Sequence, residues 1–402
     1  MRIVLLLFCF FSSLLANILQ EAIDKATPYA TIKLPNAQYK GNITIDKPLT
    51  IIGKGNAVII DGEHKGSVIT ITASDVTLQN ITIQSSGKSM QSIDAAISMH
   101  RVSHCKIKSC KIINSLYGID MDMVNDSVIS HNYISSYDED ISLRGNGLKL
   151  YYSNNNQILN NHIENVRDVT LDYSHNNKFI ANSFFNNRFA THIALSRNNV
   201  LKENLYRYNS VSMMFMGAKN TEVVNNRIES SKGAAGIAVM IGAVSNFVFK
   251  NNIVRYNAKA LYIDGKEKEK GIKRIIENNE ISYNGEAFHF HATIKDNKIV
   301  HNKIFANIED VVKDISGRFD SSNIVEYNYW DRYAGFDRDH DGIGDTPYEV
   351  YQYADQLWHY NKKIKFFYAS PIMTLLNFLS QLAPFIEPNI IMKDSKPYMK
   401  QK

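Results

Sequence analysis

The amino-acid sequence predicts an all-β protein whose body is a right-handed parallel β-helix, with an N-terminal capping helix and a helical or irregular C-terminal tail. Three observations lead to this prediction. One short phrase recurs along the chain, successive copies end 21 to 29 residues apart, and apolar residues alternate with polar ones between the copies. A period of this length indicates stacked repeats, and it is shorter than the roughly 30 or more residues of a strand–helix–strand unit. We therefore expect about ten coils of short strands.

The recurring phrase has an aliphatic pair, a polar residue, Asn-Asn or a near equivalent, one variable residue and then Ile. Clear copies occupy residues 158–163, 223–228 and 299–304. Asn accepts left-handed backbone angles at sharp turns, and its amide can bond to the same position in the next coil. A leucine-rich solenoid is disfavoured because the repeats lack regular leucines, and an antiparallel sandwich because one turn chemistry recurs at one period. The copies end at residues 112, 134, 163, 184, 205, 228, 253, 281, 304 and 330.

The two ends of the chain differ from the repeats. Residues 1–16 have the features of a signal peptide, with Arg2 before an apolar stretch and a small residue at the end, which predicts export. Residues 17–330 are predicted to form the β-helix, and apolar residues at helical spacing over 18–26 predict its capping helix. A cap is expected because open ends of stacked strands promote aggregation. Residues 331–402 form a third region with an acidic loop and an apolar docking tail.

The composition limits the classes of partner and the source of stability. The chain has 45 basic and 40 acidic residues, and its formal net charge is +5. No block of basic residues stands out, so we predict no nucleic-acid partner. After the signal peptide only Cys105 and Cys110 remain, and two cysteines cannot stabilise a chain of this length through disulfides. The stability is therefore expected to come from the core.

Stretches near both ends of the chain carry a family resemblance. The start has LQEAID at residues 19–24 and KPLTIIG at 47–53. The C-terminal signature is NYWDRYAGFD at 328–337, followed by DHDGIGDTPY at 339–348 and by FFYASP at 366–371. With these residues the chain resembles the NosD family, exported accessory proteins of nitrous-oxide reductase maturation.

The resemblance implies both a location and a set of partners. It implies a periplasmic protein that is membrane-associated through a transporter subunit. That transporter is an ABC transporter made of a membrane subunit and an ATPase, and it helps to load copper into nitrous-oxide reductase. A copper chaperone is a further implied partner. The resemblance implies no catalysis by this chain.

Thioether and imidazole side chains form the first group of candidate copper ligands. Met99 and His100 lie in one coil, and Met121 and Met123 follow 22 and 24 residues after Met99, which is one coil interval. Residues one coil apart are expected to lie side by side, and Cu(I) favours soft thioether ligands, with imidazole also acceptable. The alternative is an inward row of Ile119, Met121 and Met123 that fills the core.

Two further groups are candidates for the same chemistry. Alternation places Met214 and Met216 on the face opposite Met213, and Met240 follows about one coil later. The alternative is core packing with a flexible docking surface. His289 and His291 alternate with phenylalanines, so the two imidazoles share a face. If the phenylalanines point inward, both histidines are expected to be exposed and close enough to hold a metal.

An acidic loop follows the last repeat. Its oxygen ligands alternate as in the first part of a calcium-binding loop, and a glycine stands where the backbone must turn. The loop departs from the full helix–loop–helix motif because its twelfth position is Tyr348. Two interpretations remain, a structural calcium site and a turn that satisfies its own carboxylates. The candidate calcium ligands are Asp337, Asp339, Asp341 and Asp345.

The tail contains an apolar stripe at helical spacing after Ser370-Pro371. We predict that it docks on the membrane subunit of the transporter. The alternative is a helix packed back on the flank of the β-helix. The predicted docking residues are Leu375, Leu376, Phe378, Leu379 and Leu382.

Three classes of function compete. The first is a copper-handling and docking protein for a membrane transporter, as the resemblance implies. The second is a carbohydrate-active enzyme, a polysaccharide lyase or epimerase, which needs paired carboxylates or a calcium-linked base in a groove. Carboxylates concentrate at Asp120, Asp122 and residues 138–140, near Arg144, but the last group is best explained as a loop. The third class, an adhesin or structural solenoid, is disfavoured by the specialised tail.

Overall fold

The structure is a computed structural model, which describes residues 14–54, 57–264, 274–291, 293–313, 319–351, 363, 370–382 and 390–401. The chain is a parallel β-solenoid of about 12 turns, which confirms the predicted fold class. It divides into two compact units, the first extending to Val169 and the second from Thr170. Most of the predicted signal peptide lies outside the described residues. Within them no helix has the length and apolar character needed to cross a membrane.

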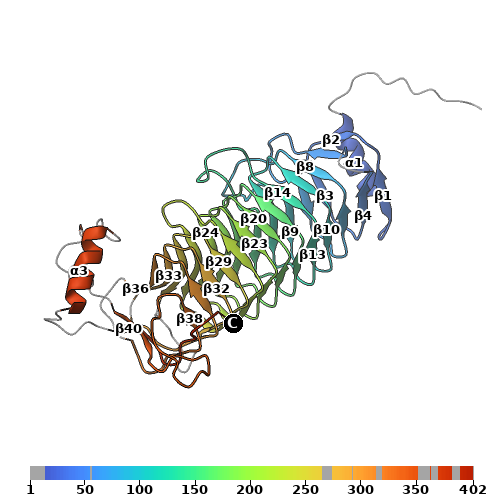
Figure 1. Ribbon diagram of the computed structural model, residues 1–402. Helices are drawn as coiled ribbons and strands as arrows, with labels where there is room; N and C mark the ends of the chain where they lie inside the picture. Colours follow the sequence, from blue (N-terminus) through green and yellow to red (C-terminus); the bar gives the residue numbers. More distant parts are fainter. Residues whose placement is uncertain are drawn as a thin grey trace, which may run out of the picture. The chain divides into compact units, whose positions relative to one another are not determined.

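In each unit a turn contributes up to three short strands, which stack on the strands of neighbouring turns to form sheets A, B and C (Figure 1). All strand pairs within these sheets that the structure describes are parallel, with residues one turn apart in register. In the first unit, sheet A has β1 (Thr31–Leu34), β4 (Thr50–Gly53), β7 (Thr77–Gln79), β10 (Lys106–Lys108), β13 (Val128–Ser130) and β16 (Gln157–Leu159); sheet B has β2 (Gln38–Lys40), β5 (Ile59–Asp61), β8 (Thr82–Gln84), β11 (Lys111–Ile113), β14 (Tyr133–Ser135) and β17 (His162–Glu164); sheet C has β3 (Ile43–Ile45), β6 (Ile69–Ile71), β9 (Ala95–His100), β12 (Tyr117–Asp122) and β15 (Leu148–Tyr151).

The second unit repeats the same arrangement, and β18 (Asp168–Asp172) spans the boundary. Its sheet A has β19 (Lys178–Ile180), β22 (Val200–Lys202), β25 (Lys219–Val224), β28 (Ser245–Lys250), β31 (Arg274–Glu277), β34 (Asn297–Val300) and β37 (Ile324–Glu326); sheet B has β20 (Ser183–Phe185), β23 (Leu205–Arg207), β26 (Arg227–Glu229), β29 (Ile253–Arg255), β32 (Glu280–Ser282), β35 (Lys303–Phe305) and β38 (Tyr329–Trp330); sheet C has β21 (Phe189–Ala194), β24 (Val211–Met216), β27 (Ile237–Gly242), β30 (Lys259–Asp264), β33 (Glu286–Phe290) and β36 (Glu309–Lys313). The remaining elements are β39 (Tyr348–Tyr351), α3 (Pro371–Leu382) and β40 (Ile390–Asp394).

The first turn is covered by α1 (Leu14–Lys25), which confirms the predicted capping helix. The helix buries Leu19 and Ile23 against the first strands. Gln20 continues the hydrogen bonding of the stack, because its side chain donates to the Thr44 carbonyl at 3.1 Å and accepts from the Thr44 N–H at 2.8 Å. The helix therefore closes the open edge that the sequence analysis identified as an aggregation risk.

The Asn-Asn phrase makes the corner between sheets A and B. Its first residue has a positive φ, for example 53° at Asn160 and 58° at Asn225. Its second residue turns inward and is buried. In the second unit seven such asparagines form a ladder. From Asn204 onward, each side-chain oxygen accepts from the backbone N–H and the side-chain amide of the asparagine one turn earlier, at 2.8 to 3.1 Å. The ladder residues are Asn182, Asn204, Asn226, Asn252, Asn279, Asn302 and Asn328. Both predicted roles of Asn are confirmed.

The C-terminal segment returns to the last turn, which the sequence analysis did not predict. β40 pairs antiparallel with β39. Beyond it, the Ser395 N–H donates to the Val325 carbonyl at 3.1 Å, and the Tyr398 N–H donates to the Asn328 carbonyl at 2.9 Å. Asp394 supplies the last acceptor of the ladder, since its Oδ2 accepts from Asn328 Nδ2 and from Trp330 Nε1, both at 2.9 Å. This segment occupies the place of a further turn.

Candidate metal-binding surface

The first predicted group of copper ligands is divided between two faces of sheet C. Met99 and Met121 are in register as predicted, but both are fully buried inside the solenoid. His100 points outward and lies 2.7 Å from a carboxylate oxygen of Asp122. Met123 is 38% exposed in the turn after β12, with a φ of 55°. The structure corrects the predicted grouping of these four residues, because successive side chains of a strand point to opposite faces.

The second predicted group lies on the outward face of sheet C in the second unit. Met213 is fully buried, whereas Met214 is half-buried and Met216 is 45% exposed. Met214 is in register with Met240 of the next turn and with His192 of the preceding turn. Adjacent strands lie about 4.8 Å apart. One imidazole and two thioethers therefore follow one another along the outward face, beside the exposed Met216. We call His192, Met214, Met216 and Met240 the soft row.

His192 is a member of this row that the sequence analysis missed. It precedes Met214 by 22 residues, which is one turn, and it occupies the same place in the alternation. An offset of about one turn, the criterion that linked Met214 with Met240, was therefore a sufficient signal. The ring of His192 also lies edge-on to that of Phe189, with 5.7 Å between their centres. Soft thioether and imidazole ligands in this order are a donor set that suits Cu(I).

His289 lies further along the same outward column, separated from Met240 by Tyr262. The phenylalanines beside it are buried inside the solenoid as predicted, but His289 is also fully buried, which corrects the predicted exposure. The ring of Tyr262 stacks on it, with 4.8 Å between the ring centres. Its Nδ1 lies 2.9 Å from Nζ of Lys259 and 2.5 Å from Oε2 of Glu286.

Nδ1 of His289 is thus engaged by two charged side chains, Lys259 and Glu286. Burial would raise the pKa of Glu286, but the hydrogen bond with His289 and the charges of His289 and Lys259 outweigh that effect and hold the pKa below its usual value. His291 is half-buried, and its ring centre lies 6.2 Å from that of Tyr262. The two histidines therefore contact the same tyrosine ring and do not form the exposed pair that was predicted.

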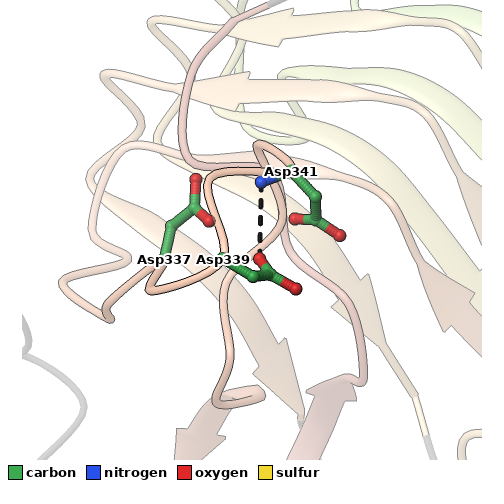
Figure 2. Close-up of side chains that lie close together, drawn as sticks. All are labelled: Asp337, Asp339 and Asp341. Atoms are coloured by element: carbon green, nitrogen blue, oxygen red, sulfur yellow. Dashed lines mark hydrogen bonds between the residues drawn. The ribbon is translucent and has the colours of Figure 1, made fainter.

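The acidic loop brings three of its four predicted ligands together. One carboxylate oxygen from each of Asp337, Asp339 and Asp341 lies within 4.8 Å of the others (Figure 2). Asp345 is not part of this group, and its Oδ2 accepts from the backbone N–H of Arg338 at 3.0 Å. Three converging carboxylates are a donor set that suits a hard cation such as calcium.

The same carboxylates also bond to their own loop. The Gly342 N–H donates to Oδ2 of Asp337 at 3.1 Å, and the Ile343 N–H donates to Oδ1 of Asp341 at 2.7 Å. The bond from Ile343 to Asp341, two residues apart, is typical of an Asx turn. The geometry thus fits both interpretations of the loop, and the structural calcium stays a prediction.

The predicted docking residues lie on α3. Leu375, Leu376, Phe378 and Leu379 are 43 to 56% exposed, and Ile372 on the same helix is 65% exposed. The side chain of Leu382 lies outside the described residues. Positions separated by three, four and seven residues share one face of a helix. The helix therefore presents a continuous apolar face that the described residues of this chain leave exposed.

The carboxylates considered for the enzyme alternative are already paired or exposed. Oδ1 of Asp120 lies 2.9 Å from Nζ of Lys149, and burial raises the pKa of Asp120 while the charge of Lys149 opposes that rise. Residues 138–140 lie in the connection between β14 and β15, as predicted. There Glu139 pairs with Lys88 at 2.5 Å. The carboxylates of Asp120, Asp122 and Glu139 are thus each held by a basic side chain, namely Lys149, His100 and Lys88.

The fold places the chain in the class of parallel β-solenoid proteins. The A-module of the Azotobacter vinelandii mannuronan C-5 epimerase AlgE6 is similar over 78% of this chain and 94% of its own, with a TM-score of 0.62 and 13% identity. A mannuronic-acid-specific family 6 polysaccharide lyase from human gut microbiota covers 78% of this chain and 84% of its own, with a TM-score of 0.58 and 14% identity. Likenesses at this identity show the fold alone.

The chain belongs to the NosD family. The sequence model of that family, described as "Periplasmic copper-binding protein (NosD)", matches residues 135–335, which include the whole soft row. Two relatives are each named "Probable ABC transporter binding protein NosD". The relative from Stutzerimonas stutzeri is 25% identical, covering 92% of this chain and 86% of its own. The relative from Pseudomonas aeruginosa is 26% identical, covering 91% and 87%. The resemblance stated from the sequence is therefore confirmed.

Proposed function

We propose that this protein is a periplasmic copper-handling and docking component that works with an ABC transporter in assembling the copper sites of nitrous-oxide reductase. The observation that carries the proposal is the soft row. It combines one imidazole with thioethers on an outward face, in the half of the chain that matches the copper-binding family. The bound metal is Cu(I), because thioethers are soft ligands that favour it.

We expect four partners, and for one of them, the membrane subunit, the chain offers a docking surface. The apolar face of α3 docks on the membrane subunit of the transporter, whose ATPase lies on the opposite side of the membrane. A copper chaperone delivers the metal, and nitrous-oxide reductase receives it. The names of the two relatives support the transporter as partner. The carbohydrate-active alternative has only the fold in its favour, since the enzymes of similar fold share 13 to 14% identity with this chain.

Replacing both Met214 and Met240 with leucine should weaken Cu(I) binding by about tenfold or more, because it removes two thioethers while nearly preserving volume. The measurement is competition with a chromogenic Cu(I) chelator under reducing conditions. Met213→Leu is the matched control, since Met213 lies on the same strand and faces the core. Met121→Leu, also in the core, should leave the affinity unchanged. Equal affinity in the double variant and the wild type would contradict the proposal.

Replacing Leu375 and Leu379 together with glutamine should weaken association with the transporter's membrane subunit by about tenfold or more, because apolar anchors dominate such interfaces. Association is measured by co-purification from membranes and by binding to the reconstituted transporter. The matched control replaces Leu195 and Ile308, which are 52% and 59% exposed, with glutamine. If both double variants bind as the wild type does, α3 is not the docking element.

A further inference from the structure

Glu229 is a buried carboxylate surrounded by three arginines on the outward face of sheet B in the second unit. Its side chain is 5% exposed. Nε of Arg207 donates to it at 2.8 Å and Nε of Arg255 at 2.7 Å, and Nε of Arg227 donates to it as well. Arg207, Glu229 and Arg255 are in register on three successive turns. One carboxylate thus fixes the orientation of three guanidinium groups.

The arginines keep Glu229 ionised and leave an excess of positive charge. Burial would raise the pKa of Glu229, but the hydrogen bonds from Arg227, Arg255 and Arg207 outweigh it and hold the pKa below its usual value. Lys232 adds a cation and Glu280, whose charge acts on Arg255, adds an anion. Four cations against two carboxylates leave two positive charges in excess. The side chains of Arg207, Arg227 and Arg255 are 37, 43 and 27% exposed, so these charges are accessible.

Three exposed tyrosines border the arginines at the corner between sheets B and C. Tyr208, Tyr256 and Tyr283 are 49, 53 and 50% exposed, and all three have positive φ angles. The guanidinium of Arg255 lies 5.4 Å from the ring centre of Tyr256, which in turn stacks on Tyr283 at 5.5 Å. Exposed Tyr and Arg side chains held in fixed positions are the composition of interface hot spots. We call the three arginines and three tyrosines the Arg–Tyr surface.

The Arg–Tyr surface lies one corner away from the soft row. β23 ends at Arg207, the corner begins with Tyr208, and the next strand, β24, carries Met214. The same succession occurs one turn later, where β26 ends at Glu229 and β27 carries Met240. Because these strands are short, a protein that covers the arginines also reaches the edge of the outward face of sheet C.

We propose that the Arg–Tyr surface docks an acidic face of the protein that exchanges copper with the soft row. The inference rests on the proposed function and adds the chemistry of the partner, a carboxylate-rich surface beside its own copper site. Carboxylates pair with guanidinium groups through charge-assisted hydrogen bonds. Complementary charge also accelerates and orients the encounter. The tyrosines supply apolar contact around these pairs.

The test compares charge reversal on this surface with the same reversal elsewhere. Arg227→Glu removes the most exposed of the three guanidiniums, and Lys202→Glu makes the same change of charge at a side chain that is 44% exposed on sheet A. The probes are purified apo nitrous-oxide reductase and the apo copper chaperone, each bound to the full mature chain. Association rates are measured at about 0.05 and 0.3 M salt, where screening differs strongly. Arg227→Ala and Tyr256→Ala are second variants, and thermal unfolding checks that each is folded.

Arg227→Glu should slow association with one of the two probes by about tenfold or more at low salt and reduce its salt dependence. Lys202→Glu should have little effect, and Cu(I) stoichiometry should be unchanged in both variants. Association that is the same in Arg227→Glu and the wild type overturns the inference, as does binding of neither probe to the wild type. The double leucine variant of Met214 and Met240 separates the two proposals. Retained docking with retained copper binding in that variant would overturn the proposed function and leave the docking result intact.

Discussion

Replacing Asn252 with aspartate should destabilise the second unit by about 4 kcal/mol or more at neutral pH. Asn252 is fully buried in the middle of the ladder, and its amide donates to the Val223 carbonyl at 2.9 Å and to Oδ1 of Asn279 at 3.1 Å. Aspartate has the same shape, but an oxygen replaces the amide nitrogen that donates both hydrogen bonds. It therefore places a buried charge against two acceptors, each of which loses the hydrogen bond from the side-chain amide, although Oδ1 of Asn279 keeps the bond from the backbone N–H of residue 252.

The effect is measured by urea unfolding, followed by hydrogen exchange to locate the loss. Asn252→Ala is the matched control, and it should cost less, about 2 to 3 kcal/mol, because it leaves groups unpaired but buries no charge. Protonation of the introduced carboxylate restores one donor, so the deficit of the aspartate variant should shrink as the pH falls. A deficit no larger than that of Asn252→Ala at neutral pH would contradict the assigned direction of the ladder.

Replacing Asp394 with alanine should cost about 3 to 5 kcal/mol and expose the last turn of the solenoid. The carboxylate accepts from the backbone N–H of Asn328 at 3.2 Å, from its side-chain amide at 2.9 Å and from Trp330 Nε1 at 2.9 Å. Alanine leaves these three buried donors without their acceptor. Trp330 fluorescence reports the change, in a Trp358→Phe background because the chain has 2 tryptophans.

Asp394→Asn is the corresponding control, because its side-chain oxygen still accepts. It should be tolerated much better than alanine, which is the reverse of the result at Asn252. Burial raises the pKa of Asp394, although the hydrogen bonds from Trp330 and Asn328 oppose that rise. The folded protein thus holds this proton more tightly than the unfolded chain does. Wild type should therefore gain stability relative to Asp394→Asn as the pH falls between the raised folded pKa and the ordinary value. Equal loss in the alanine and asparagine variants would contradict the role of the carboxylate as the final acceptor.

The sequence predicts spatial neighbours well, because its period equals one turn of the solenoid. Met99 with Met121 and Met214 with Met240 are in register as the offsets predicted. The number of turns was underestimated, about ten against about 12, because the first turns lack the Asn-Asn phrase. The strand Ile43–Ile45, for example, is recognisable only by its alternating isoleucines. Periodicity therefore predicts the register between neighbouring turns well and the number of turns less well.

Exposure is the property that periodicity does not determine. Alternation correctly places His289 outward, yet Tyr262, Lys259 and Glu286 surround it and bury it. Those contacts depend on the lengths and conformations of side chains from different turns. Asp394 was missed for another reason. It lies 66 residues after Asn328 in the sequence, outside any repeat, so no offset links the two.

The direction of the asparagine ladder has a consequence for how the protein is made. Each ladder asparagine donates its backbone N–H and one side-chain N–H to the side-chain oxygen of the following turn, so these donors stay unpaired until that turn has formed. A chain delivered amino end first can therefore assemble vectorially, with α1 as a fixed starting template. The N–H groups of Asn328 and Trp330 in the last turn stay without this acceptor until Asp394 has been delivered and has folded onto them. A polypeptide that ends before Asp394 keeps an exposed sheet edge at its last turn, and a second molecule can pair with that edge.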